Sequence, residues 1–179
     1  MKATMFLSRL IYASRAVDSL QTADVEQILE ASRRNNGKVG VSGVLLFSAR
    51  EFLQCLEGSR EAVNQTYARI LGDPRHAEVL MLDYREVSRR LFPDWSMQAL
   101  APGLLSRQRV LRYSERELFS PTRMGAASAL AMLEDIASDF ERHGLAEVSA
   151  AREPGSTPAE PLYASARSSL LAKLRGGAG

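Results

Sequence analysis

The alternation of hydrophobic and polar positions divides the first hundred residues into seven segments. Five have the short apolar or alternating pattern that is typical of β-strands, namely 5–13, 41–48, 51–58, 77–87 and 95–100. Two repeat apolar residues at the spacing of an α-helix, namely 22–34 and 60–72. The order β-α-β-β-α-β-β predicts an α+β, ferredoxin-like fold with both helices on one face of a mixed sheet. The opposite face then needs a separate cover.

Short-range patterns predict where the helices begin and end. Thr22 has the side chain of an N-cap, and the run Asn35-Asn36-Gly37 tolerates the left-handed conformation that ends a helix. We therefore expect the first helix to stop near residue 34. In the second helix, the positions predicted to face inward are Val63, Tyr67, Ile70 and Leu71.

The C-terminal third supplies candidates for the cover. Ser114 and Glu117 have the spacing of a capping box. Apolar residues then recur at helical spacing over 121–143, with Pro121 suited to a first helical turn and Gly144 as the expected stop. This helix either covers the sheet or forms a dimer surface, and the pattern does not decide between the two.

Beyond residue 144 the composition changes. Pro and Gly interrupt 145–162, which predicts a flexible linker. The segment from Leu162 onward is basic and carries several leucines, so it is either a disordered tail or a docking segment that folds on an acidic partner. We accordingly expect a core at 1–100, capping helices at 101–144 and a flexible tail at 145–179, with no enzymatic output domain.

Composition narrows the class of protein. A net charge of +2 is too small to indicate nucleic-acid binding, and Cys55 is the only cysteine, so no intrachain disulfide forms. No apolar run approaches the roughly 18–20 residues of a membrane span, so we expect a cytoplasmic protein without membrane contact. With two histidines and one cysteine we expect no metal site, and the common phosphate-binding and hydrolase motifs are absent.

Gln54 is the residue that the predicted pattern of strands and helices explains least. Strand alternation places it on one face with Phe52 and Leu56, where an unpaired amide costs roughly 1–3 kcal/mol. Other polar or polarisable residues in apolar settings are Tyr12, Asn35, Asn36, Trp95 and Met97. Taken singly, each has a plain structural explanation as a core side chain, a helix stop or a gap filler.

Taken together, these residues resemble one family, the blue-light sensors that use flavin, or BLUF domains. The segments that carry the resemblance are LIYAS (10–14), RRNNGKVGVSGVLLF (33–47), FLQCLEG (52–58), ILGDPRH (70–76) and FPDWSMQ (92–98). Their order and spacing agree with the family over roughly residues 5–143.

The resemblance implies a flavin held between the two helices, FAD first, with FMN or riboflavin as alternatives. The residues implied to bind it are Tyr12, Asn35, Asn36, Gln54, Arg69, Asp73 and His76. An amide at Asn36 matches the alternating acceptors and donor along the edge of the flavin ring. Gln54 can bond the ring and Tyr12 at once, which gives its amide a reason to be buried.

The resemblance also implies a photochemical switch rather than an enzyme. In that mechanism Tyr12 passes an electron and then a proton to the excited flavin, and the Gln54 amide afterwards rotates or tautomerises. Trp95 and Met97 pass the change on, to an unidentified downstream protein or to a change in homo-oligomeric state. Cys55 faces away from Gln54 by strand alternation, which argues against a cysteine adduct.

Two other classes of protein stay open on the sequence alone. One is a flavin-free ferredoxin-like interaction module, which would be colourless when purified. The other is a small acylphosphatase-like hydrolase, whose chemistry needs an arginine in a glycine-rich loop after the first strand. Arg15 lies at that point, but no glycine does, which makes the hydrolase the weaker alternative.

Overall fold

One five-stranded sheet carries helices on both of its faces. The computed structural model describes residues 6–100 and 102–148. Its main elements are β1 (Leu7–Ala16), α1 (Thr22–Val39), β2 (Ser42–Ser48), β3 (Glu51–Ser59), α2 (Arg60–Leu71), β4 (His76–Glu86), β5 (Gln98–Leu100), α3 (Arg107–Tyr113) and α4 (Ala126–Val148). The short 3-10 turns η1 (Pro102–Leu104) and η2 (Pro121–Arg123) precede α3 and α4.

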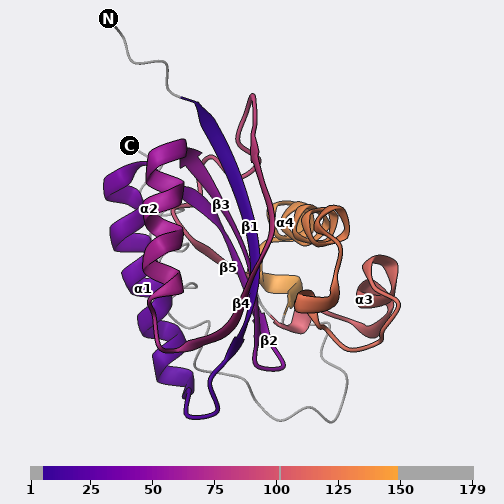
Figure 1. Cartoon of the computed structure of the whole chain (residues 1–179). Coiled ribbons are helices and arrows are strands. Elements are labelled where there is room, and N and C mark those ends of the chain that lie inside the picture. Colours follow the sequence, from indigo (N-terminus) through magenta and orange to yellow (C-terminus); the bar gives the residue numbers. More distant parts are fainter. Residues whose placement is uncertain (1–5, 101, 149–179) are drawn as a thin grey trace, which may run out of the picture.

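The strands lie in the order β4-β1-β3-β2-β5, with β5 parallel to β2 and the other neighbours antiparallel. The helices α1 and α2 lie side by side on one face of the sheet, and α4 lies on the other (Figure 1). The predicted ferredoxin-like arrangement, followed by C-terminal helices, is therefore confirmed.

Strand alternation sends side chains into two separate cores. Tyr12 and Leu56 pack with the helices α1 and α2, whereas Ile11 and Leu53 point to the opposite face. On that opposite face, α4 contributes the buried residues Ala129, Met132, Leu133 and Ile136. The long C-terminal helix thus covers the sheet, a point that the sequence pattern had left undecided.

The strands β2 and β3, which match the predicted segments 41–48 and 51–58, form a hairpin with a tight turn. Ala49 and Arg50 have φ values of 49° and 64°, as a two-residue turn between right-twisted strands requires. Across β3, Gln54 stands opposite Leu45 on one side and opposite Tyr12 on the other. Because opposed residues share a face, Gln54 and Tyr12 both point toward α1 and α2.

The first helix is longer than predicted. The expected stop near residue 34 is wrong, because α1 continues to Val39 and ends at Gly40, whose φ is 68°. Asn36 therefore lies inside the helix, where it is 2% exposed and its amide donates to the Ser96 carbonyl at 3.2 Å. This tertiary contact outweighs the local tendency of Asn and Gly to end a helix.

Two smaller expectations at the helix ends are also wrong. Thr22 is the first residue of α1 rather than its cap, and the backbone amide of Gln21 donates to the Asp24 carboxylate at 2.8 Å. Leu71 is 55% exposed, because it is the last residue of α2 and lies beyond the part of the helix that packs on the sheet.

The strand predicted at 95–100 is wrong in its first half. β5 covers only Gln98–Leu100, so Trp95 and Met97 precede it. The carbonyl groups of Ser96 and Met97 bond side chains of α1 instead of continuing the ladder with β2. The Gly43 amide of β2 still donates to the Trp95 carbonyl at 2.7 Å, so bonds to a helix take the place of regular pairing at Ser96 and Met97 alone.

The C-terminal third contains a helix that the sequence analysis missed. α3 is capped by Ser106, whose hydroxyl accepts from the Arg109 amide at 3.2 Å. The capping box expected at Ser114 and Glu117 starts no helix, because the Ser114 hydroxyl accepts from the Arg116 amide at 3.1 Å instead of from Glu117, and Glu117 pairs with Arg107 of α3.

The expected stop at Gly144 is also wrong, since α4 runs to Val148. A glycine costs a helix only about 1 kcal/mol relative to alanine, and no proline follows until Pro154. The division of the chain at residues 100 and 144 stays a prediction. The part of the predicted tail from residue 149 lies outside the described residues.

Within 6–100 and 102–148, no helix is both long enough and apolar enough to cross a membrane. The predicted cytoplasmic location is not tested by this finding and stays a prediction.

Candidate functional site

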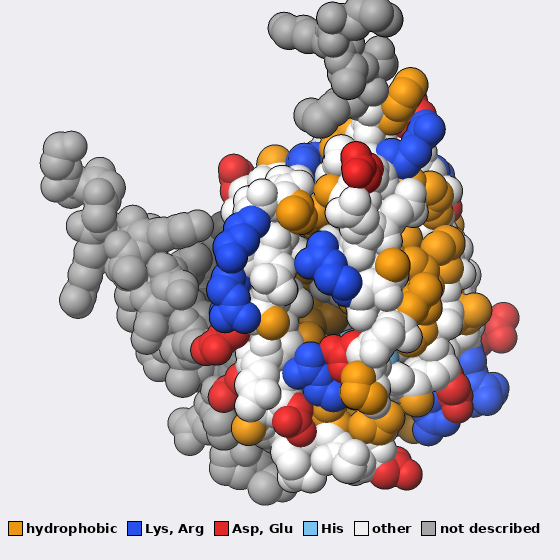
Figure 2. Space-filling view, turned by 60° about the vertical axis from the view of Figure 1, so that its left-hand side comes forward, with side chains coloured by type: hydrophobic (Ala, Val, Ile, Leu, Met, Phe, Trp, Pro, Cys, Tyr) orange, Lys and Arg blue, Asp and Glu red, His pale blue; other side chains and the backbone are white. Residues whose placement is uncertain are grey.

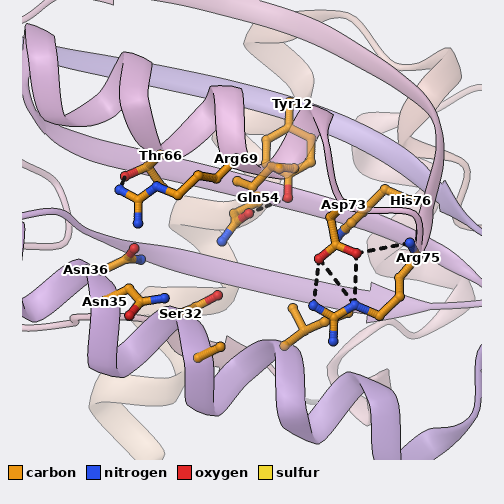
Figure 3. A pocket seen from close by; sticks show the side chains of 13 residues that line it. Tyr12, Ser32, Asn35, Asn36, Gln54, Thr66, Arg69, Asp73, Arg75 and His76 are labelled. Carbon is orange, nitrogen blue, oxygen red and sulfur yellow. Dashed lines mark hydrogen bonds and ion pairs between the residues drawn. The ribbon is translucent and has the colours of Figure 1, made fainter.

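A cavity of about 150 Å³ lies between α1 and α2, above the strand residues Tyr12 and Gln54. Figure 2 shows a hollow on this face, with basic side chains on either side of it. In Figure 3, α1 supplies asparagines from one side of the cavity and α2 supplies Thr66 and Arg69 from the other. The residues implied to bind a flavin all line this cavity, namely Tyr12, Asn35, Asn36, Gln54, Arg69, Asp73 and His76.

Gln54 connects the cavity to the chain before β5 through both ends of its amide. The Tyr12 hydroxyl donates to Oε1 of Gln54, and Nε2 of Gln54 donates to Sδ of Met97 at 3.0 Å. These bonds form a relay of Tyr12, Gln54 and Met97, whose side chains are 1%, 3% and 2% exposed respectively. Water therefore does not compete for the bonds. The predicted pairing of Gln54 with Tyr12 is confirmed, and Met97 is its second partner.

The two residues singled out before β5 lie on opposite faces of the sheet. Met97 packs into the core under α1 and α2, whereas Trp95 packs against the core under α4. The Trp95 ring stacks on Phe92, with centroids 5.7 Å apart and planes 14° apart. The cavity lining includes neither residue, and Met97 is linked to the lining by its hydrogen bond with Gln54.

Asn36 is anchored at one end and points its other end toward the cavity. Its Nδ2 donates to the Ser96 carbonyl, which leaves Oδ1 to accept from a group inside the cavity. Asn35 lies beside it on α1 and is half-buried (Figure 3). Two amides on adjacent helix positions therefore border the same space.

Burial keeps the Tyr12 hydroxyl protonated. Desolvation raises the pKa of Tyr12 far above its usual value of 10.0, and the nearby Tyr67 and Asp73 raise it further. The Tyr67 ring lies 5.7 Å away, tilted by 54°. Loss of the proton alone is therefore unfavourable for Tyr12 in this environment.

Asp73, Arg75 and His76 form a fixed rim before and at the start of β4. Arg75 makes a two-pronged ion pair with Asp73, at 2.9 and 2.6 Å, which lowers the pKa of the Asp73 carboxyl. Nδ1 of His76 lies 2.8 Å from the Ser14 hydroxyl, and its ring centroid lies 4.6 Å from that of Phe52. Burial lowers the pKa of His76, with Asp73 acting in the opposite direction, so this ring is neutral at pH 7.

Sequence reasoning missed several polar residues at the cavity. Arg75 belongs to the segment 70–76 that carried the resemblance and could have been found there. Ser32 and Thr66 also line the cavity, but small hydroxyl residues on helices give no distinctive pattern. Arg69, which was predicted, lies on an exposed part of α2 and bonds the Thr66 hydroxyl at 3.4 Å.

Cys55 is separated from the cavity by the sheet itself. Its side chain is buried in the core under α4, as strand alternation predicted. Burial raises the pKa of the thiol, and Glu57 raises it further, so the reactive thiolate is disfavoured. The geometry therefore rules Cys55 out as a group that reacts with a ligand in the cavity.

We expect His76 to make the stability of the protein depend on pH on the acidic side of neutrality. Its folded pKa lies below the unfolded value of 6.5, so the unfolded state binds the proton more readily. The contribution of neutral His76 to the free energy of unfolding is therefore fully present above pH 6.5, and it is lost as the pH falls through the folded pKa. Urea unfolding from pH 8 to pH 5 should show this slope in the native sequence and a flatter one in His76→Gln. Parallel curves for the two proteins would contradict the assignment.

Comparison with known proteins agrees with this geometry. Residues 7–98 match the family described as sensors of blue-light using FAD. The BLUF protein BlrB, solved in its dark state, is 31% identical with a TM-score of 0.62, over 76% of this chain and 98% of BlrB. The blue light- and temperature-regulated antirepressor BluF of Escherichia coli is 36% identical over 85 residues, 46% of this chain and 21% of BluF. Photoactivated adenylate cyclase subunit beta of Euglena gracilis is 31% identical over 101 residues, 56% of this chain and 12% of that protein.

The fold and the buried Tyr12–Gln54 pair beneath a cavity define a photosensory domain of the flavin-using kind. The match covers half of the chain, and the chain belongs to the BLUF family of blue-light sensors. BLUF domains bind a flavin, FAD or FMN. The chain spans only 12% of the cyclase subunits and 21% of the antirepressor, so the activities of those whole proteins are not assigned to this chain.

Proposed function

We propose that this chain is a photosensory switch without catalytic turnover, which signals through a partner protein or through its own oligomeric state. The observation that carries the proposal is the buried relay of Tyr12, Gln54 and Met97. The relay starts at the cavity and ends on the chain before β5. It therefore leads away from the ligand toward the backbone of the sheet, as a signal requires.

The residues at the cavity suit the edge of a flavin ring. That edge alternates acceptor, donor and acceptor, and a primary amide can both donate and accept. We assign Asn36 to this edge, because its Oδ1 is available to a ring N–H while its Nδ2 holds Ser96. We place further ring or side-chain contacts at Asn35, Arg69, Asp73 and His76, since they line the same cavity.

When bound, the flavin supplies blue-light absorption and an electron acceptor. We assign Tyr12 as the donor of an electron and then of a proton, because its hydroxyl is buried, protonated and bonded to Gln54. If the Gln54 amide then rotates by about half a turn, its Oε1 faces Sδ of Met97. Both atoms are acceptors, so the bond from Gln54 to Met97 cannot persist. The change is thereby passed from the cavity to Met97.

We assign Trp95 and Met97 to the transfer of this change out of the core. The two residues lie on opposite faces of the sheet, and only one residue separates them along the chain. A shift of Met97 therefore acts directly on the contact of Trp95 with Phe92, under α4. By their names, the relatives act as an adenylate cyclase and as an antirepressor. For this chain we propose a downstream protein or a second copy as the receiver.

The test compares the protein in the dark and after blue light. The full chain, reconstituted with FAD, should show flavin absorption and a small red shift that reverts in the dark. Its mass in solution and its binding partners, measured in both states, would separate the oligomer route from the partner route. A protein that stays colourless with FAD, FMN and riboflavin would contradict the proposal and favour the flavin-free interaction module.

Asn36→Ala is expected to weaken flavin binding. The variant loses a bond to the ring and the anchor to Ser96, so we expect a dissociation constant roughly tenfold higher or more. Flavin fluorescence titration measures this change. Asn64→Ala is the matched control, because Asn64 is exposed on α2 and bonds the Tyr84 hydroxyl away from the cavity. Equal dissociation constants for the two variants would contradict the role of Asn36.

A further inference from the structure

The backbone before β5 is held by two side chains from a single helix. Nε of Arg33 donates to the Met97 carbonyl at 3.1 Å, and Nδ2 of Asn36 donates to the Ser96 carbonyl at 3.2 Å. Arg33 and Asn36 are three positions apart, so they lie on the same face of α1. Two successive carbonyl groups, those of Ser96 and Met97, are therefore fixed to α1, the helix that borders the cavity on one side.

Anchors on both sides limit where this segment can move. Upstream, the buried Glu57 carboxylate accepts from the amides of Leu91 and Phe92 and pairs with Arg9 at 2.7 Å. Downstream, the ladder with β2 begins at β5. Between these points the Trp95 carbonyl accepts from the Gly43 amide of β2 at 2.7 Å, and the bonds from α1 hold the next two residues, Ser96 and Met97.

Met97 is held through its side chain and through its backbone. Its sulfur accepts from Gln54, and its carbonyl accepts from Arg33. Arg33 is half-buried, and burial lowers the pKa of its guanidinium while Glu30 acts in the opposite direction. A guanidinium stays charged under these conditions, so its bond to the carbonyl is charge-assisted and stronger than a neutral one.

We propose that Arg33 is a positioning residue of the photoswitch, which holds Met97 against Gln54 in the resting state and thereby sets the rate of return from the illuminated state. The inference rests on the proposed roles of Gln54 and Met97. Arg33 belongs to the segment 33–47 that carries the resemblance, but it was not among the residues implied to bind the flavin, and it does not line the cavity.

The physical basis is the loss of one of the two bonds at Met97. After the Gln54 amide rotates, its oxygen repels the Met97 sulfur, and the residue shifts away from the bond geometry that Arg33 requires. The bond from Arg33 is thus strongest in the resting state and forms again on the way back. Removing it destabilises the resting state and the approach to it, so the return in the dark becomes slower.

The test uses the full chain reconstituted with FAD. Arg33→Met has a side chain of similar length without a donor, and Arg34→Met on the exposed face of α1 is the matched control. We expect both to bind flavin and to show the initial red shift. Dark recovery should be about three- to tenfold slower in Arg33→Met than in the native sequence, with Arg34→Met unchanged and Arg33→Lys intermediate. Equal recovery rates in the two methionine variants would overturn the proposal.

A second readout reports on the carbonyl itself and does not depend on recovery rates. Met97-Gln98 is the only Met-Gln pair in the chain, so ¹³C-carbonyl methionine combined with ¹⁵N-glutamine labels this single peptide bond. Its ¹³C resonance should shift on illumination of the native protein and should already be displaced in dark Arg33→Met. A resonance that does not respond to light in a protein with a normal red shift would overturn the inference alone. A protein without any red shift would instead overturn the proposed function.

Discussion

Tyr12→Phe is expected to abolish the reversible red shift while leaving the flavin bound. The change removes a buried hydroxyl that donates to Gln54 and, by our assignment, the source of the electron and the proton. The ring itself remains, so the packing against Tyr67 and His76 is preserved. Absorption spectra before and after blue light measure the effect. Gln54→Leu should have the same outcome, because it removes the amide that changes its bonds.

Tyr67→Phe is the control for this prediction. Tyr67 lies against Tyr12 and is also buried, but its hydroxyl makes no bond to Gln54. We expect it to keep a normal red shift. A normal photocycle in Tyr12→Phe, or its loss in both tyrosine variants, would contradict the assignment of Tyr12 as the donor.

Gly43→Ala is expected to cost the largest amount of stability among the changes considered. A Cβ at this position would lie 1.9 Å from the Cys55 carbonyl oxygen, and φ is 157°. The clash is with backbone of the neighbouring strand, so β2 and β3 would have to separate next to Gln54. We expect a loss on the order of 4 kcal/mol, or failure to fold, with loss of bound flavin. Urea unfolding and the retained absorption of the flavin measure both effects.

Gly37→Ala is the matched control within the same chain. Gly37 is exposed on α1, and an added Cβ would meet no atom within 4 Å. Replacing a helical glycine by alanine should stabilise the protein by about 0.5–1 kcal/mol. If Gly43→Ala were as stable as the native sequence, the close approach of β2 to β3 would be wrong.

Strand alternation carried much of the prediction. The period of two placed Gln54 and Cys55 on opposite faces of β3, and the structure confirms both. The Tyr12–Gln54 pair was implied by the resemblance to the family, and it forms because strands β1 and β3 pair with Tyr12 opposite Gln54. The face on which each strand residue lies depends on short-range periodicity, which the sequence already shows.

The helix boundaries show where local patterns fail. Asn35-Asn36-Gly37 has the composition of a helix stop, yet α1 continues to Gly40 because Asn36 is buried and bonded to Ser96. Gly144 similarly stands inside α4. Asn and Gly only permit a helix end, and for Asn36 a contact from a distant part of the chain decided that this end was not used.

By itself the sequence determined the fold class and the order of the strands and helices along the chain, because these follow from periodicity. The side chains that line the cavity were implied by the resemblance to the family. Only the tertiary structure decided that Met97 lies with Gln54 while Trp95 lies under α4, and that Arg33 holds the segment before β5. That segment lies outside the regular ladder, so alternation says nothing about it. Its position depends on bonds such as the one from Arg33 to Met97, which joins residues 64 positions apart and exists only after the sheet and helices have assembled.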